Sequence, residues 1–221
     1  FSAQKKFDKG FSLNTLFKYN SVGIVTSRDH LVIGEKKNIL SKKLNSFFNN
    51  DLDFCKTVLK VKENSSFKIN DVKLKSNFDK KFIKAISYRQ FDERYIYFDT
   101  KNFIERSRGN LQSNFNSFNS SIIFRRQQPE SNDLYVFTSK SVIADGYIRS
   151  DNKGGETIAP LYIYPITNGQ QTIEQTSERT PNLNAEIVKQ IAEKLGLNFT
   201  SEKEPTKDTF APIDILDYIY A

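Results

Sequence analysis

The chain has 221 residues, of which 38% are hydrophobic and 13% aromatic, so it can fill the core of one large or two small domains, and wholesale disorder is excluded. The mean hydropathy is −0.55, no apolar run approaches the roughly 20 residues that cross a bilayer, and the only cysteine, Cys55, excludes an internal disulfide and favours a reducing, cytoplasmic location. The net charge of +7 is uneven, because residues 1–84 carry +10, residues 85–149 carry +2 and residues 150–221 carry −5.

This concentration of positive charge has two explanations. A basic segment attracts polyanions such as nucleic acid. Codon usage is the alternative, because the 24 lysines, 20 asparagines and 19 phenylalanines of the chain all have A/T-rich codons. Charge alone leaves both explanations open.

The first third of the chain predicts two short strands followed by helices. Residues 21–28 and 31–34 are rich in β-branched residues and read as strands. Residues 35–50 carry apolar side chains at helical spacing with lysines on the other face. Asp51 is placed to cap a second helix, and residues 62–72 are polar and are expected to connect it to the rest.

The middle of the chain is predicted to form β-strands, and its end is predicted to form helices. The expected strands are residues 82–89, 94–99, 120–127, 133–139 and 158–165. Residues 151–157 are expected to form a turn that pivots on two glycines. Asn182 or Asn184 can cap a helix that ends at Gly196, and Pro212 suits the first turn of a last helix.

These elements predict a mixed α+β fold with a largely antiparallel sheet and flanking helices, because their alternation is too irregular for a doubly wound parallel sheet. We expect one domain over residues 1–221, with two possible sub-lobes: a basic helical and strand part, residues 1–80, and a sheet with C-terminal helices, residues 81–221. The start at Phe1 and the abrupt end predict a piece of a longer protein.

The stretch Arg89–Asp99 places two arginines, acids and aromatics side by side. Its charges suit an active-site wall, a surface that grips a charged ligand, or a structural network of ion pairs. We predict that Arg89, Asp92 and Arg94 form a structural network of ion pairs, while the aromatic residues fill the sheet.

The sequence contains no recognisable catalytic motif. His30 is the only histidine and has no nucleophile elbow near it. One histidine and one cysteine cannot build a structural zinc site, and both the phosphate-binding glycine motifs and an Asn-Pro-Pro-Tyr motif are missing. A metal-dependent nuclease built on Asp92, Glu93 and Asp99 is a minor alternative. We therefore predict no catalytic residue, metal or cofactor within this piece.

Other residues suit DNA binding, since arginine reads guanine and amides read adenine, while lysine contacts phosphates. The candidates for base reading are Arg106, Arg108, Asn110, Gln112, Arg125, Arg126, Gln127 and Gln128. The candidates for phosphate contacts are Lys36, Lys37, Lys42 and Lys43. Taken singly, each is better explained as an ordinary polar residue of a loop with crossing ion pairs; for the set together, binding is the better explanation.

Several segments, in order, resemble the target-recognition region of Type ISP restriction–modification enzymes and their Type IIG-like relatives. The matching segments are residues 22–33, 88–98, 120–127, 133–148, 159–165 and 209–221. Family members carry a Tyr-Arg-Pro-Phe-Asp-x-Arg block. Here Tyr88, Arg89, Phe91, Asp92 and Arg94 match this block, and Gln90 replaces the proline.

The resemblance implies a module that selects a short DNA sequence and does not itself catalyse. In that family the module follows an N6-adenine DNA methyltransferase domain, which uses S-adenosylmethionine, within a chain that methylates or cleaves DNA. Its expected partners are double-stranded DNA and that methyltransferase domain, with no membrane. A protein-interaction module with a basic docking face is the alternative function.

Overall fold

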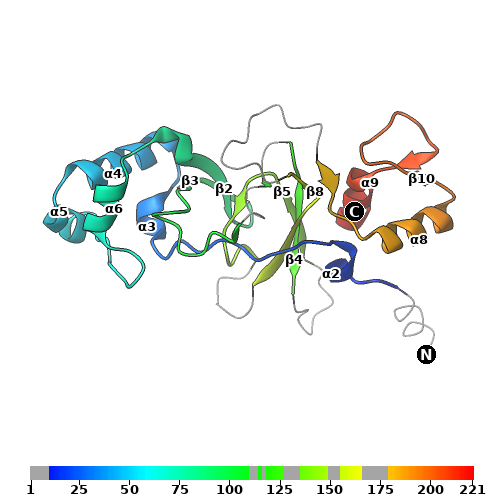
Figure 1. Ribbon diagram of the computed structural model, residues 1–221, viewed down its shortest axis with the longest axis horizontal. Helices are drawn as coiled ribbons and strands as arrows, with labels where there is room; N and C mark the ends of the chain where they lie inside the picture. Colours follow the sequence, from blue (N-terminus) through cyan, green and yellow to red (C-terminus); the bar gives the residue numbers. More distant parts are fainter. Residues whose placement is uncertain (1–9, 110–113, 116–117, 127–134, 149–154, 166–178) are drawn as a thin grey trace. The chain divides into compact units, whose positions relative to one another are not determined.

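The computed structural model describes residues 10–109, 114–115, 118–126, 135–148, 155–165 and 179–221 (Figure 1). The chain divides into two compact units, each assembled from separate stretches of sequence. The first unit comprises residues 1–22, 113–140 and 154–221, and the second unit comprises residues 23–112 and 141–153.

The second unit is built on a four-stranded sheet in the order β1–β3–β2–β6. Its centre is an antiparallel hairpin of β2 (Ile83–Arg89) and β3 (Asp92–Tyr97), in which Arg89 pairs with Asp92. Strand β1 (Ile33–Gly34) is antiparallel to β3, and β6 (Val142–Ile143) is parallel to β2. The hairpin therefore has a loop of only two residues at its end.

Helices cover this sheet within the second unit. They are α3 (Asp29–Val32), α4 (Lys37–Asn49), α5 (Leu52–Thr57) and α6 (Ile69–Lys75), with a 3-10 turn η1 (Lys80–Phe82) before β2. Helix α4 buries Leu40, Leu44 and Phe47, which recur at helical spacing and so share one face. Figure 1 shows α4, α5 and α6 grouped together beside β3.

Aromatic rings form the centre of the core of the second unit. Phe103 packs edge-on against Phe47 and Tyr97, with ring centroids 5.5 and 5.2 Å apart, and contacts Phe67 at 5.8 Å. All four rings are almost fully buried. This cluster joins α4 to β3 through side chains that are far apart in sequence.

The first unit contains a three-stranded antiparallel sheet in the order β5–β4–β7. The strands are β5 (Val136–Ser139), β4 (Ser121–Arg125) and β7 (Glu156–Pro160). Two smaller pairings complete it: β8 (Tyr162–Ile163) runs antiparallel to β9 (Thr180–Pro181), and β10 (Asn198–Phe199) runs parallel to β11 (Thr209–Phe210).

The helices of the first unit are α2 (Leu13–Leu16), α8 (Ala185–Leu195) and α9 (Pro212–Tyr220). The Asn184 side chain caps α8 by accepting a hydrogen bond from Glu186 N, and Gly196 ends it in the left-handed region with φ 66°.

The N-terminal segment of the first unit is tied to residues far along the chain. Ser21 N donates to Ile158 O at 2.9 Å, and Tyr19 N donates to the Asn182 side chain at 2.8 Å. Asn182 is fully buried and its amide also donates to the carbonyls of Tyr19 and Pro160. One asparagine therefore joins this segment to the end of β7.

The predicted mixed α+β fold with largely antiparallel pairing is confirmed. Three local predictions were wrong. Of residues 31–34, which were predicted to form a strand, Leu31 and Val32 lie in α3 and only Ile33 and Gly34 form β1. Residues 21–28 form isolated bridges instead of a strand, because Ser27 takes a left-handed φ of 56° and α3 begins directly after Arg28. Residues 62–72 include the start of α6, whose first amide, Ile69 N, is capped at 2.9 Å by the side chain of Glu63. The glycine pivot predicted at residues 154 and 155 lies partly outside the described residues.

In the described part of the chain, no helix combines the length and apolar character needed to span a bilayer.

We expect Phe103→Ala to destabilise the second unit by about 3–5 kcal/mol, because it removes the ring that three other buried rings contact and leaves a cavity. Leu74→Ala is the control: Leu74 is 86% exposed, so its loss should change stability by about 0.5 kcal/mol or less. Urea unfolding of both variants measures the difference, and equal midpoints would contradict the role given to Phe103.

Candidate nucleic-acid interface

Two arginines stack on one tyrosine at the end of the β2–β3 hairpin. The guanidinium carbons of Arg89 and Arg94 lie 4.2 and 4.5 Å from the centroid of the Tyr88 ring. The Tyr88 hydroxyl donates to the Asp29 carboxylate at 2.7 Å, which ties the hairpin to α3. Burial raises the pKa of Tyr88, and the hydrogen bond to Asp29 raises it further. The ring is therefore neutral and fixed at ordinary pH.

The predicted ion pairing is confirmed for Arg94. This arginine donates through Nε to both oxygens of Asp92, at 2.9 and 3.0 Å, and its second nitrogen lies 2.8 Å from Asp92. The hydrogen bonds to Asp92 raise the pKa of Arg94. Arg89 is held differently, because it donates to the carbonyls of Tyr88 at 2.6 Å and Asp145 at 3.3 Å.

The prediction that the aromatics of this stretch fill the sheet holds for Tyr97 and Phe98 but is wrong for Phe91. Phe91 is 91% exposed and adopts a left-handed backbone with φ 59°. For a residue other than glycine this backbone costs about 1–2 kcal/mol. Leaving the ring in water forgoes about 1.5–3 kcal/mol of burial. The end of the hairpin therefore carries an exposed aromatic residue on an unfavourable backbone conformation.

Arg106 and Arg108 lie beside the segment that leads into α3. Val25 and Arg106 exchange two backbone hydrogen bonds, at 3.1 and 2.9 Å, and Arg108 donates through Nε to Gly23 O at 3.0 Å. The Arg106 side chain is exposed, while that of Arg108 is half-buried. Two predicted base-reading residues are thus brought together, in contact with a segment more than 80 positions away in the chain.

Gly23 is required at this place because a β-carbon would clash with the backbone of Ala144 and Asp145. The close approach lets Asp145 N donate to Ile24 O at 2.9 Å, while Asp145 O accepts from Arg89. These contacts run without a break from the hairpin end to Arg108. The side chains concerned are those of Arg89, Arg94 and Arg108, while Arg106 is linked to the same segment through its backbone alone.

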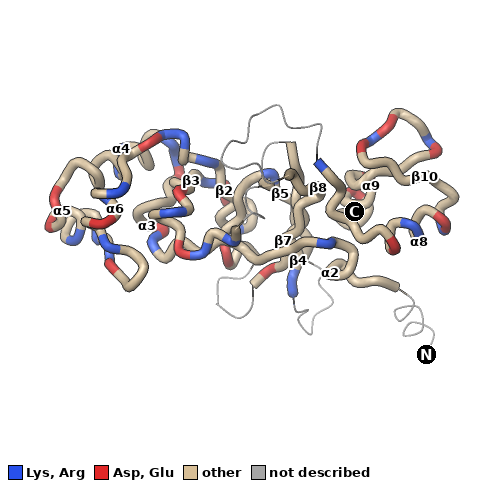
Figure 2. Tube along the Cα trace, in the orientation of Figure 1, with Lys and Arg blue, Asp and Glu red and all other residues tan. Residues whose placement is uncertain are grey.

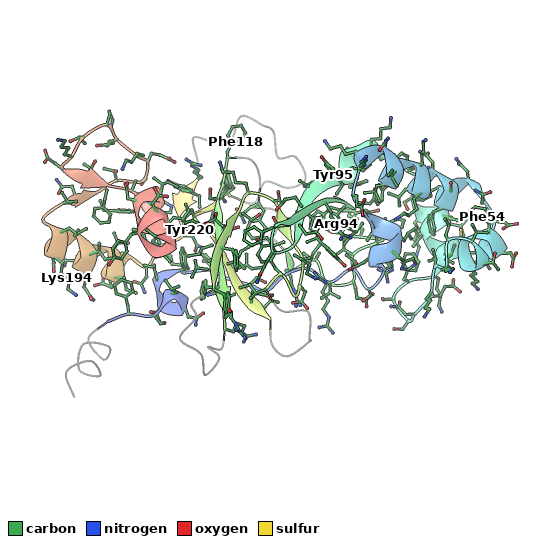
Figure 3. The ribbon with its side chains drawn as sticks, turned by 180° about the vertical axis from the view of Figure 1, so that it is seen from behind. Phe54, Arg94, Tyr95, Phe118, Lys194 and Tyr220 are labelled. Carbon is green, nitrogen blue, oxygen red and sulfur yellow. The ribbon has the colours of Figure 1, made fainter. Side chains whose placement is uncertain are left out.

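The predicted phosphate-binding lysines lie at the start of and along α4. Lys36, Lys37 and Lys42 are exposed, and the first turn of α4 has no acidic residue. The Lys37 ammonium lies 5.2 Å from the ring of Tyr95, a residue that Figure 3 labels next to Arg94 on β3. Figure 2 shows the positive residues along α4 and at the neighbouring end of the sheet. The α4 surface is therefore a positive patch.

Lys43 is engaged in the fold. Its ammonium donates to the carbonyls of His30 at 2.6 Å and Ile33 at 3.1 Å, which lie at the end of α3 and in β1. Burial lowers the pKa of Lys43. This lysine thus anchors α4 to the preceding segment.

A basic groove of about 810 Å³ in the second unit was missed at the sequence level. It is lined by four lysines, Lys75, Lys80, Lys81 and Lys101, and by Asn45 of α4, Asn77 and Asn102. The two aspartates that line it, Asp79 and Asp99, accept hydrogen bonds from backbone amides of the following turns. The adjacent pair Lys80 and Lys81 was the only sequence signal, since the lysines converge only once η1 and β3 pack.

In the first unit, Arg125 and Arg126 end β4 as predicted. Arg125 lies opposite Glu156 in the sheet register, and its guanidinium is 5.6 Å from the Tyr135 ring. Arg126 is exposed and lines a polar pocket of about 450 Å³. The other residues lining this pocket are Asn14, Asn20, Ser21, Val22 and Thr157. An arginine beside amide and hydroxyl groups can bind an anionic or hydrogen-bonding ligand.

Four of the predicted base-reading residues, Asn110, Gln112, Gln127 and Gln128, lie outside the described residues.

The acids considered for a nuclease centre have separate partners. Asp92 pairs with Arg94, Glu93 accepts a hydrogen bond from Ser87, and Asp99 accepts one from the Asn102 side chain at 2.8 Å. Within the described ranges, no three or more His, Cys, Asp or Glu side chains are grouped so as to hold a metal ion.

A family model described as the Type ISP C-terminal specificity domain matches residues 15–221. A comparison with curated proteins found no match.

Among solved structures, the chain is similar to part of a DrdV–DNA complex determined by cryo-EM, with a TM-score of 0.58 and 20% identity over 96% of this chain and 20% of that one. It is also similar to a nuclease-deletion mutant of the Type ISP restriction–modification enzyme LlaGI in complex with a DNA substrate mimic (TM-score 0.50, 20% identity, 80% of this chain and 18% of that one). A third is the ATP-dependent Type ISP restriction–modification enzyme LlaBIII bound to DNA (TM-score 0.56, 15% identity, 81% and 12%). At these identities the likeness concerns the fold, and the chain spans a fifth or less of each matched chain.

We expect Tyr88→Phe to lower stability by about 1 kcal/mol at neutral pH, because it keeps the ring under both arginines but removes the hydrogen bond to Asp29. The raised pKa of Tyr88 means that the unfolded chain releases this proton first as pH rises. The stability contributed by the hydroxyl is therefore present below about pH 10 and lost above it.

The gap in stability between the wild-type protein and Tyr88→Phe should accordingly narrow between about pH 8 and about pH 11. Tyr218→Phe is the control, since Tyr218 is 86% exposed. Chemical unfolding at both pH values measures the gap, and a gap that widens with pH would show that the sign is wrong.

Proposed function

Since the chain belongs to the Type ISP C-terminal specificity domain family, we propose that it recognises a short sequence in double-stranded DNA and leaves the chemistry to other domains of its polypeptide. The family match over residues 15–221 confirms the resemblance read from the sequence and is the observation that carries the proposal. The DNA complexes of LlaGI, LlaBIII and DrdV support it. The exposed cations described above support it independently.

The activity of the whole protein is part of this proposal, because the chain covers only a fifth or less of each matched chain. We propose that the parent protein is a cytoplasmic adenine-N6 DNA methyltransferase, with or without DNA cleavage. Its S-adenosylmethionine would be bound by the methyltransferase domain, since this sequence has neither an Asn-Pro-Pro-Tyr motif nor a glycine-rich cofactor loop. The cofactor would supply the methyl group, and this chain would hold the DNA in register for it.

Phosphate contacts would come from the α4 patch. Lys36 and Lys37 lie at the N-terminal end of α4, where the helix dipole favours an anion and the first turn has no acidic residue, although Glu35 directly precedes Lys36. Lys42 is exposed one turn further along. Lys43 would contribute mainly by holding α4 in place, because two carbonyls already accept hydrogen bonds from its ammonium. The basic groove offers further cations in Lys75, Lys80 and Lys101, whereas Lys81 is paired with Asp79 at 2.7 Å.

Base reading would use forked or amide side chains that project from the fold. Arg106 and Arg126 are the described candidates with exposed side chains. Arg108 and Arg125 are partly engaged, with Gly23 O and with the ring of Tyr135. We also propose as base-reading residues the four amide side chains that follow these arginines in the chain: Asn110, Gln112, Gln127 and Gln128.

We expect Lys42→Ala in the full-length protein to weaken binding to all duplexes alike. Loss of one phosphate contact should reduce the slope of log affinity against log salt by about 0.9. Lys194→Ala is the control, an exposed lysine on α8 that is labelled in Figure 3 and is not a candidate. Fluorescence anisotropy with random-sequence duplex measures both. An unchanged slope for Lys42→Ala would remove it from the set of phosphate contacts.

We expect Arg126→Ala to relax sequence preference, because a bidentate arginine–guanine contact supplies about 1–3 kcal/mol of discrimination. Arg126→Lys keeps the charge but not the fork, so it should lose the preference while keeping most of the overall affinity. Sequencing of duplexes enriched from a random library by each protein measures the preference. If all three proteins enrich one sequence equally, Arg126 is not a reader; if the wild-type protein binds no duplex and an acidic protein competes instead, the module docks a protein.

A further inference from the structure

Two turns and two helices supply the residues that line the basic groove of the second unit. The first turn, residues 76–79, leads from α6 into η1, and the second, residues 99–102, comes shortly after β3. Lys75 ends α6, and Asn45 lies on α4. The lining residues are up to 57 positions apart in the sequence, from Asn45 to Asn102. The groove therefore exists only in the folded unit.

Both turns are held in place by buried polar groups. Asp79 N donates to the hydroxyl of Tyr97 at 3.2 Å, and Tyr97 is fully buried. Asp99 is 3% exposed and accepts hydrogen bonds from Lys101 N at 3.1 Å and Asn102 N at 3.3 Å. The lysines of the groove thus stand on turns whose backbone is already fixed. A fixed backbone lowers the entropy cost of binding a ligand.

The groove keeps a surplus of positive charge after its acids are counted, since four lysines line it against two aspartates. Lys81 is paired with Asp79 at 2.7 Å, and the carboxylate of Asp99 accepts hydrogen bonds within its own turn. Asp71 lies one turn before Lys75 on α6, but it does not line the groove, and the described residues show no ion pair between the two. Three exposed lysines are left to attract an anion: Lys75, Lys80 and Lys101.

The chemistry of the groove suits the DNA backbone better than base edges. Its described lining includes no arginine, and two of its three amides are engaged. Asn45 donates to the carbonyl one turn earlier on α4 at 3.0 Å, and the Asn102 side chain donates to Asp99 at 2.8 Å. The rings of Phe78 and Phe82 pack against a buried tyrosine of β3. Lysines remain, and lysine contacts phosphates without reading sequence.

The groove continues the positive patch of α4. Lys42 and Asn45 are three positions apart on this helix, so they lie on one face. Lys42 is exposed on the patch, and Asn45 lines the groove. Asn45 follows Lys37 by eight positions, which is about 12 Å along the helix axis. Because each strand of a duplex carries a phosphate about every 3.4 Å of its axis, this distance corresponds to roughly three to four base pairs.

We propose that the basic groove binds the phosphate backbone of duplex DNA beside the recognised bases, as the continuation of the α4 patch. This inference rests on the proposed function and deepens it, because it gives the module a contact that depends on the length of the duplex and on salt but not on sequence. Such contacts fix the position of a protein on DNA without selecting a base. A duplex that ends before the groove loses them.

The test uses the full-length protein and a duplex that the wild-type protein has enriched from a random-sequence library. The duplex is shortened from each end outside the enriched sequence, and affinity is measured by fluorescence anisotropy. Wild-type affinity falls once one flank no longer reaches the groove, whereas the double variant Lys80→Ala/Lys101→Ala binds the long and the short duplex alike. Its slope of log affinity against log salt is lower by about 1.8, so raising salt from about 50 to 200 mM costs the wild-type protein about ten-fold more affinity.

Matched variants separate charge from other effects. Lys80→Arg/Lys101→Arg keeps both charges and retains the dependence on length. Lys68→Ala removes an exposed lysine at the opposite end of α6, outside the groove, and changes neither readout. Neutral methylphosphonates in the flank weaken binding of the wild-type protein and leave that of the double alanine variant unchanged. The melting temperatures of all variants match the wild-type value, because the side chains are exposed.

Three results would count against the inference. If the double alanine variant keeps the wild-type dependence on length and salt, the groove does not bind the backbone, while the proposed function stands. If that variant enriches a different sequence, the groove reads bases, and a contact with the backbone alone is overturned. If the wild-type protein enriches no duplex, the proposed function fails, and the inference about the groove fails with it.

Discussion

The arrangement of the second unit around its hairpin depends on the stacking of two guanidinium groups against the ring of Tyr88. Two cations on one ring repel each other, and the arrangement is stable because each positive charge has a second partner. Asp92 offsets Arg94, and the carbonyls of Tyr88 and Asp145 accept hydrogen bonds from Arg89. Each of these partners belongs to a different part of the backbone. The stack therefore joins the hairpin, the residues after β6 and, through Asp29, helix α3.

The positive charge of this protein divides between cations that hold the fold and cations that face solvent. Arg28 is buried, stacks on Phe67 at 4.1 Å and pairs with Glu105, and Lys43 binds two carbonyls. Lys42 and Arg126 are exposed. A count of lysines and arginines in the sequence treats these groups alike. Only the exposed ones are available to a polyanion, so the effective binding surface is smaller and more sharply located than the net charge indicates.

The sequence predicted features that depend on neighbouring residues, but it did not predict contacts between residues far apart in the chain. Periodicity and capping residues predicted α4, α5, α8 and α9, because helix formation depends on neighbours within four positions. The pairing of Asp92 with Arg94 was predictable for the same reason. The start of α6, the basic groove and the contact of Arg108 with Gly23 each need a partner from elsewhere in the chain. The exposure of Phe91 was not predicted, because hydrophobic residues in strand-like segments usually face a core.

The buried Asn182 has a consequence for synthesis of the chain. The residues that precede the second unit reach their final positions only when the ribosome has delivered the strand and asparagine that receive them, more than 130 residues later. During that interval residues 23–112, the larger part of the second unit, have already been made. The early segment therefore lacks the partners of its backbone amides until the chain is nearly finished.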